Sequence, residues 1–119
     1  MSTTESVDRA ILTARAKAIT ARELGVYMQR TAGSQKASER GRKVMPLGVP
    51  SSFQAYDPHP IVVRRAQAAW MEDVDGNRYV DFDMGFGALF SGHCHPAVRD
   101  AVEKQLDNGT LFVTPCEMK

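Results

Sequence analysis

The stretch from Ala69 to Pro96, AWMEDVDGNRYVDFDMGFGALFSGHCHP, decides the fold of this chain. Polar and apolar residues alternate at its start, stop at Asp75-Gly76-Asn77, and resume with aromatic and β-branched residues, a pattern typical of a β-hairpin. An Asp-Gly or Gly-Asn pair supplies the positive φ angle that a tight hairpin turn requires. The composition then changes to glycines, two phenylalanines and two imidazoles, which predicts a loop that can approach a ligand closely.

The sequence on either side of this hairpin predicts the remaining elements of the same region. We expect a three-stranded antiparallel meander, with strands near residues 60–66, 69–75 and 78–83. A helix near residues 96–107 should follow, because Pro96 suits its first position and Asn108-Gly109 suits its C-cap.

The first part of the chain has helical periodicity. Apolar residues recur at helical spacing over residues 2–30, where Ser2–Glu5 fits a capping box and Thr20–Glu23 offers a second one at which the helix can break. We expect Ser34 to cap a short second helix that Pro46 ends. None of these residues forms a catalytic pattern.

Composition excludes several classes of function. The chain has 119 residues, 43% hydrophobic and 24% charged, which is ordinary for a globular protein. Fifteen basic and fourteen acidic residues leave a net charge of +1, so we expect neither nucleic-acid binding nor attraction to a membrane. Two cysteines, Cys94 and Cys116, and the absence of an apolar signal or spanning segment predict a cytoplasmic protein with free thiols.

Two motifs resemble ligand-binding loops but fail on their spacing. An EF-hand loop with Gly76 at its sixth place would have Met71 first and Phe82 twelfth, so both terminal carboxylates would be missing. The Gly85-x-Gly87 turn has Phe90 where a dinucleotide-binding motif needs its third glycine. A hairpin turn and a non-nucleotide loop are the better interpretations.

The imidazoles of His93 and His95, with Cys94 between them, form a candidate metal cluster. Only Cys116 and scattered carboxylates could complete a tetrahedral set, and none has a spacing that recurs in metal sites. We therefore expect no metal.

The order DVDGN-R-Y-V-D-F, a Gly/aromatic/Gly turn, GHCHPAV and GTLFVTPCE resembles the N-terminal part of class III pyridoxal-phosphate aminotransferases, most closely the glutamate-1-semialdehyde aminomutase branch. The resemblance runs from about Ser34 to the last residue. It implies the N-terminal part of a fold-type I transferase of the α/β class, with residues 1–33 as a helical extension and 34–119 as an N-terminal segment of the small domain. Residues 114–119 look like the start of another helix, so we expect the opening quarter of a longer protein, with the large cofactor-binding domain absent.

The resemblance also implies a reaction. Enzymes of this family transfer an amino group between a small-molecule donor and acceptor, as homodimers, by means of pyridoxal 5'-phosphate bound to a lysine of the large domain. The five lysines present here do not match that lysine's motif, so we assign no catalytic residue to this chain. A non-catalytic alternative is a truncated paralogue that associates with an intact aminotransferase.

The resemblance points to two substrate-pocket residues, Gln54 and Phe86. Gln54 aligns with an arginine that grips the substrate carboxylate in the aminomutase branch, and an amide cannot supply the charged bidentate fork. Phe86 stands where that branch usually has tryptophan, so an aromatic wall remains without the indole N–H donor. Gln54 satisfying loop backbone and Phe86 packing in a core remain alternatives. The resemblance also implies that His93 and His95 order their loop by hydrogen bonds. Substrate identity, and transaminase against mutase, stay open.

Overall fold

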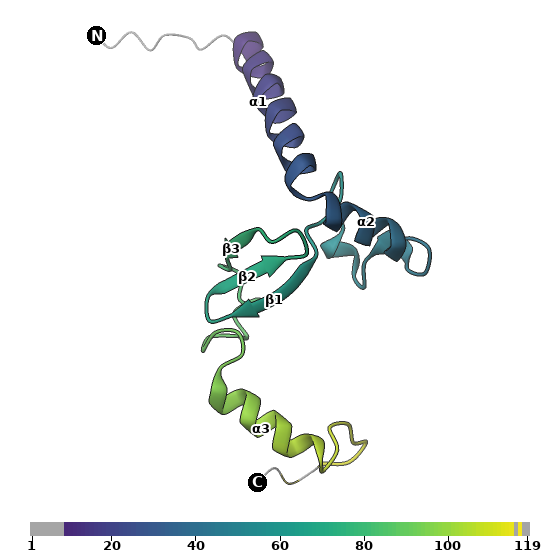
Figure 1. Cartoon of the computed structure of the whole chain (residues 1–119), viewed down its shortest axis with the longest axis vertical. Helices are drawn as coiled ribbons and strands as arrows, with labels where there is room; N and C mark the ends of the chain where they lie inside the picture. The colour runs from purple at the N-terminus through teal and green to yellow at the C-terminus, as the bar shows by residue number, and fades with distance from the viewer. Residues whose placement is uncertain (1–8, 116, 118–119) are drawn as a thin grey trace, which may run out of the picture. The chain divides into compact units, whose positions relative to one another are not determined.

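The computed structural model describes residues 9–115 and residue 117. The chain divides into two compact units, of which the first ends at Val62 and the second begins at Val63. In chain order (Figure 1), the elements are α1 (Arg9–Arg30), α2 (Ala32–Gly41), the 3₁₀ turns Pro46–Gly48 and Ser52–Gln54, β1 (Val63–Gln67), β2 (Trp70–Asp73), β3 (Arg78–Val80) and α3 (Pro96–Leu106).

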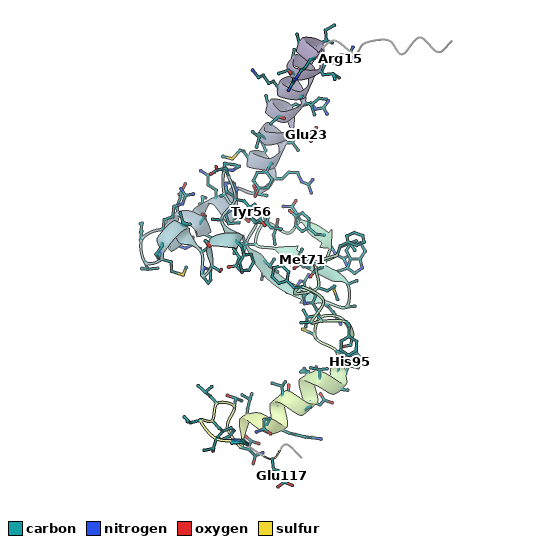
Figure 2. The ribbon with its side chains drawn as sticks, turned by 180° about the vertical axis from the view of Figure 1, so that it is seen from behind. Arg15, Glu23, Tyr56, Met71, His95 and Glu117 are labelled. Atoms are coloured by element: carbon teal, nitrogen blue, oxygen red, sulfur yellow. The ribbon has the colours of Figure 1, made fainter. Side chains whose placement is uncertain are left out.

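Helix α1 runs without a break from Arg9 to Arg30, so the predicted break at Thr20 is wrong. Glu23 would have to turn back to the backbone to close the predicted capping box. Its carboxylate is instead bound by Arg22, at 2.6 Å from Nη2, and both Glu23 and Arg15 lie exposed on the helix (Figure 2). The capping box at Ser2–Glu5 lies outside the described residues. Within residues 9–115, no helix combines the length and the apolar character that a membrane crossing needs.

A buried polar junction joins α1 to α2. The Thr31 hydroxyl donates to the Tyr27 carbonyl oxygen at 2.6 Å, and His59 Nε2 lies 2.9 Å from Thr31 Oγ1 and 3.2 Å from the Thr31 carbonyl oxygen. A carbonyl oxygen only accepts, so Nε2 carries the hydrogen. The Tyr27 hydroxyl donates to the His59 carbonyl oxygen, which closes the network.

The predicted cap at Ser34 is also wrong. Thr31 takes the N-cap position, with non-helical φ and ψ of −125° and 33°, and Ser34 lies buried inside α2. The Ser34 hydroxyl accepts a hydrogen bond from the Val62 backbone N–H at 3.1 Å, so it fixes a distant segment of the same unit. Helix α2 ends at Gly41, before the predicted stop at Pro46.

The three strands form one antiparallel sheet in the order β1-β2-β3, which confirms the predicted meander (Figure 1). The pair Gln67↔Trp70 leaves a two-residue turn, Ala68-Ala69, between β1 and β2. Ala68 has a φ of 50° there. Two-residue hairpin turns of the primed types need a positive φ, which glycine usually supplies. The helix predicted after the sheet is also confirmed as α3.

The second hairpin turn is built around the carboxylate of Asp73. The loop of residues 74–76 ends at Gly76, which has a φ of 85°, as in a type I turn followed by a left-handed residue. Asp73 Oδ1 accepts the backbone N–H groups of Asp75 and Asn77 at 2.9 and 2.8 Å. Asp73 Oδ2 accepts from Asn77 Nδ2 at 2.9 Å and from the Tyr79 hydroxyl at 2.8 Å. All of the hydrogen-bonding demand of this buried carboxylate is therefore met within its own hairpin.

Polar groups, and not apolar ones, make up the buried interior of the described residues. No hydrophobic side chain among them is fully buried, and the buried residues are Thr31, Ser34, Ser38, His59 and Asp73. Helices α1 and α3 carry large apolar side chains that are exposed, such as Ile19 and Val102. Local hydrogen-bond networks therefore shape each unit. A helix was expected to start within residues 114–119, but Thr114, Pro115 and Glu117 are not helical, and the other three residues lie outside the described ones.

We expect Asp73→Asn to destabilise the hairpin by about 2 kcal/mol at neutral pH, because an amide nitrogen cannot accept from Asn77 and Tyr79. Burial raises the pKa of Asp73, but its hydrogen bonds outweigh burial and hold the pKa below its usual value. The stabilisation is therefore complete above the unfolded-state pKa of about 4 and disappears as pH falls through the lower folded-state pKa. Urea unfolding of the wild type and the variant at pH 7 and pH 2.5 measures this difference.

Asp75→Asn is the matched control, since it removes one charge from the same turn and leaves the Asp73 carboxylate in place. Equal losses of stability in the two variants, or a loss in Asp73→Asn that does not change with pH, would contradict the role given to Asp73.

Candidate functional site

The loop after β3 is the candidate functional site, and the backbone fastens both of its ends to the β1–β2 turn. At one end, the Asp81 N–H donates to the Ala69 carbonyl oxygen at 2.9 Å. At the other, Ala68 and His93 exchange two backbone hydrogen bonds, of 2.9 and 2.8 Å, as an isolated antiparallel bridge. Such a compact loop with closely held ends resembles an Ω-loop, a kind of loop that is frequently functional.

The side chains of Asp81 and His93 meet across the base of the loop. His93 Nε2 lies 2.7 Å from Asp81 Oδ2, and the two side chains are 19% and 9% exposed. Asp81 Oδ1 accepts the backbone N–H groups of Asp83 and Met84, both at 2.9 Å. The Met84 N–H and then the His93 side chain hold the pKa of Asp81 below its usual value. The carboxylate therefore stays charged and binds three donors at once.

Beyond Asp81 the backbone turns in the left-handed sense. Met84, Gly85, Phe86 and Gly87 have consecutive φ angles of 48°, 61°, 57° and 82°. Non-glycine residues pay about 1–2 kcal/mol each for a left-handed conformation. Two backbone hydrogen bonds hold the turn, from the Gly87 N–H to the Asp83 oxygen at 3.0 Å and from the Leu89 N–H to the Met84 oxygen at 2.9 Å. Backbone strain of this kind tends to collect at functional sites.

Phe86 lies inside this left-handed turn, and its side chain is 78% exposed. Its ring is not buried among the described residues, so neither the pocket role nor the core alternative is decided by them. Its backbone N–H points to Asp83 Oδ2 at 3.4 Å. Whether the ring faces a substrate stays a prediction.

Gln54 is the last residue of the 3₁₀ turn Ser52–Gln54, and it is exposed. Its backbone N–H donates to the Ser51 carbonyl oxygen at 2.9 Å. Ala55 and Tyr56, the next two residues, line an open groove of about 610 Å³ together with Arg42, Leu47, Asp57 and Pro60 (Tyr56 is labelled in Figure 2). Gln54 belongs to the first unit and Phe86 to the second, so their joint role in a pocket stays a prediction.

The remaining candidate residues form no cluster for a bound ion. Among the described residues no group of three or more His, Cys, Asp and Glu side chains is placed to hold a metal. His95 takes the N-cap position of α3 without a side-chain capping bond (Figure 2), and the Cys94 thiol, 3.4 Å from the Ala66 carbonyl oxygen, is free and exposed. Cys116 lies outside the described residues.

Sequence reasoning found one half of the polar pair at the loop base. Of the two histidines expected to order the loop by hydrogen bonds, His93 does so, whereas His95 makes no side-chain capping bond. The partner Asp81 was not singled out. A signal for it exists, because aspartate directly after a strand and before a glycine-rich stretch is typical of a residue that binds backbone N–H groups further on. The distance of twelve residues to His93 left the pairing itself without a local signal.

Comparison with known proteins gives a family match and several relatives. The family profile "Aminotransferase class-III" matches residues 52–117. Glutamate-1-semialdehyde 2,1-aminomutase of Methanocella arvoryzae is 40% identical over 86 residues, which are 72% of this chain and 20% of that protein.

Two solved structures are similar to the chain over most of its length. A glutamate-1-semialdehyde aminomutase from Pseudomonas aeruginosa PAO1 matches with a TM-score of 0.79 and 31% identity, over 87% of this chain and 23% of that one. A β-phenylalanine aminotransferase from Variovorax paradoxus matches with a TM-score of 0.70 and 31% identity, over 75% of this chain and 21% of that one. The chain thus spans about a fifth of the length of these relatives.

We expect Gly92→Ala to destabilise the loop base more than Gly87→Ala. Both glycines have positive φ angles, of 89° and 82°, so each alanine costs about 1 kcal/mol or more in backbone strain. A Cβ at Gly92 would also lie 3.1 Å from the Cα and carbonyl oxygen of Ala68, whereas a Cβ at Gly87 meets nothing within 4 Å. The test is the free energy of unfolding of the two variants, measured in urea. Equal losses of stability would contradict the close contact between Gly92 and Ala68.

Proposed function

Because the chain belongs to the class-III aminotransferase family, we propose that the full-length protein is a pyridoxal-phosphate-dependent aminotransferase or aminomutase. The family profile carries this conclusion, since it matches residues 52–117, more than half of the 119 residues. The match confirms the resemblance found in the sequence, and the solved relatives match the chain with TM-scores of 0.70 and 0.79. The fold is the N-terminal portion of a fold-type I transferase.

The described part of the chain does not fit a covalent cofactor site. A cofactor lysine that forms a Schiff base lies desolvated or beside another cation. Lys17, Lys36, Lys43 and Lys104 are all exposed, so none of them is desolvated. We therefore assign no chemical step to these lysines, and in our proposal pyridoxal 5'-phosphate is held by a part of the full-length protein outside this chain.

In our proposal this chain contributes to the substrate side of the active site. Phe86 provides an aromatic wall at the left-handed turn, and Gln54 provides an amide where the aminomutase branch is expected to have an arginine. Two exposed side chains with these chemistries support a substrate other than glutamate semialdehyde, because an amide binds a carboxylate more weakly than a guanidinium does. The substrates are then a small-molecule amino donor and an acceptor.

Three further parts of the proposal rest on the sequence and the family resemblance. We propose a homodimer, a cytoplasmic location, and a division into a helical extension at residues 1–33 and a small-domain segment at 34–119. The exposed apolar side chains on α1 and α3 are compatible with a larger assembly. The non-catalytic module has less support, because the relatives found carry the names of enzymes.

The first test of the proposed pocket is Phe86→Ala in the full-length protein. We expect its preference among amino donors, from alanine to β-phenylalanine, to change by about fivefold, because one lost aromatic contact is worth on the order of 1 kcal/mol. Stability should change little, since the ring is exposed. Phe90→Ala, at 93% exposure in the same loop, is the control and should leave the preference unaltered. A uniform loss of activity toward every donor, with a large drop in Tm, would contradict the pocket role.

The second test concerns the cofactor. We expect the 119-residue chain, mixed with pyridoxal 5'-phosphate and reduced with borohydride, to show only weak labelling spread over several lysines. A stable Schiff base needs a lysine that is desolvated or beside another cation, and the described lysines are all exposed. Mapping of the labelled peptides by mass spectrometry makes the measurement, with the full-length protein as the positive control. Stoichiometric labelling of one lysine in the short chain, together with turnover of an amine, would place the active site within these residues.

A further inference from the structure

We propose that Asp81 and His93 are positioning residues whose hydrogen-bonded side chains close the loop of residues 82–92 and fix the place of Phe86. The inference rests on the proposed function, in which Phe86 lines the substrate pocket, and adds the residues that determine where its ring lies. Its starting point is the contact of 2.7 Å between His93 Nε2 and Asp81 Oδ2.

The loop has little apolar packing to hold its shape. Phe82, Phe86 and Phe90 are 92%, 78% and 93% exposed, so the burial of their rings contributes little within the described residues. Met84 and Phe86 at the same time adopt the unfavourable left-handed conformation. A strained loop without a buried apolar anchor depends on its polar contacts. The carboxylate of Asp81, with three donors, is the most highly connected polar group among those contacts.

A continuous series of contacts leads from His93 to Phe86. His93 Nε2 donates to Asp81 Oδ2, because a carboxylate oxygen can only accept. Asp81 Oδ1 accepts the N–H of Met84, the residue with which the left-handed turn begins. Phe86 is the third residue of that turn, so a shift of Asp81 moves the start of the turn and turns the ring. The imidazole is thus connected to the ring through one carboxylate and one backbone amide.

The backbone anchors of the loop are separate from this side-chain pair. The backbone groups of Asp81 and His93 bind Ala69 and Ala68 whether or not their side chains meet. Loss of the pair should therefore loosen residues 82–92 and leave the sheet and α3 in place. This separation distinguishes a positioning role from a general structural one, which would weaken the whole unit.

The experiment compares His93→Leu with His93→Gln in the full-length, cofactor-loaded protein. Leucine removes the donor, whereas the glutamine amide nitrogen reaches the place of Nε2 and can still donate to Asp81. His95→Leu is the matched control, because His95 makes no side-chain capping bond. If His93→Leu does not fold, His93→Asn replaces it, since its polar amide is too short to reach Asp81. The readouts are hydrogen exchange of the loop peptide, and kcat and KM with alanine and β-phenylalanine as amino donors.

In His93→Leu we expect amide exchange across residues 82–92 to be about tenfold faster, as expected for the loss of a charge-assisted hydrogen bond, with exchange in α3 unchanged. The preference between the two donors, given by the ratio of their kcat/KM values, should change by about tenfold. The change should arise chiefly in KM, because a misplaced Phe86 ring weakens binding and orientation of the donor. His93→Gln and His95→Leu should stay within about twofold of the wild type in both readouts.

Three other outcomes overturn the inference in different ways. Unchanged loop exchange in His93→Leu would refute the side-chain pair as the closure of the loop, whatever the kinetics. Faster exchange with an unaltered donor ratio would refute the link to Phe86. A wild-type protein that uses neither donor nor any other amine would refute the proposed function and the substrate part with it, while the exchange result would still decide whether the pair closes the loop.

Discussion

A buried carboxylate, that of Asp73, is the constraint on which the hairpin depends. Burial of an ion without partners is costly, and the chain meets that cost with four donors from three residues within the next six positions, Asp75, Asn77 and Tyr79. Since these donors come from the turn and from β3, the carboxylate sets the register of β2 against β3. That register in turn determines where β3 ends and therefore where Asp81 begins the glycine-rich loop.

In both units of the chain, a polar side chain with little exposure fixes the local backbone through its hydrogen bonds. In the first unit, the hydrogen bond between His59 and Thr31 holds the junction of α1 and α2. In the second unit, Asp73 holds the second hairpin turn, and Asp81 with His93 closes the loop. Hydrogen bonds are directional, so they fix local geometry with few contacts, but each contributes only about 1 kcal/mol, or somewhat more when a charge takes part. These hydrogen bonds specify the conformation of each turn. The large apolar side chains of the described residues are exposed, so apolar burial contributes little to their stability.

How much could be predicted from the sequence depended on how far apart the interacting residues are. The three strands, the turn at Gly76 and the start of α3 at Pro96 were predicted correctly, because alternation, glycine and proline act on their immediate neighbours. The N-cap of α2 was not, because it is Thr31 in place of Ser34, and Thr31 is fixed by His59, a residue 28 positions away. Ala68 in a left-handed turn gave no signal because alanine carries no preference for that conformation. Of the candidate site, the loop and the ordering role of His93 were predictable, but the pairing with Asp81 was not.

The contact between Gly41 and Gly48 has a consequence for how the sequence of the first unit can change. A Cβ at Gly41 would lie 2.5 Å from the Gly48 carbonyl oxygen, and a Cβ at Gly48 would lie 2.8 Å from the Ser38 carbonyl oxygen. Neither obstacle is a flexible side chain that could swing aside. A substitution at either glycine must therefore reroute the backbone between them, after which the other glycine no longer faces the same neighbour. The stability losses caused by substitutions at residues 41 and 48 should then be non-additive, with the double variant losing less than the sum of the two single variants.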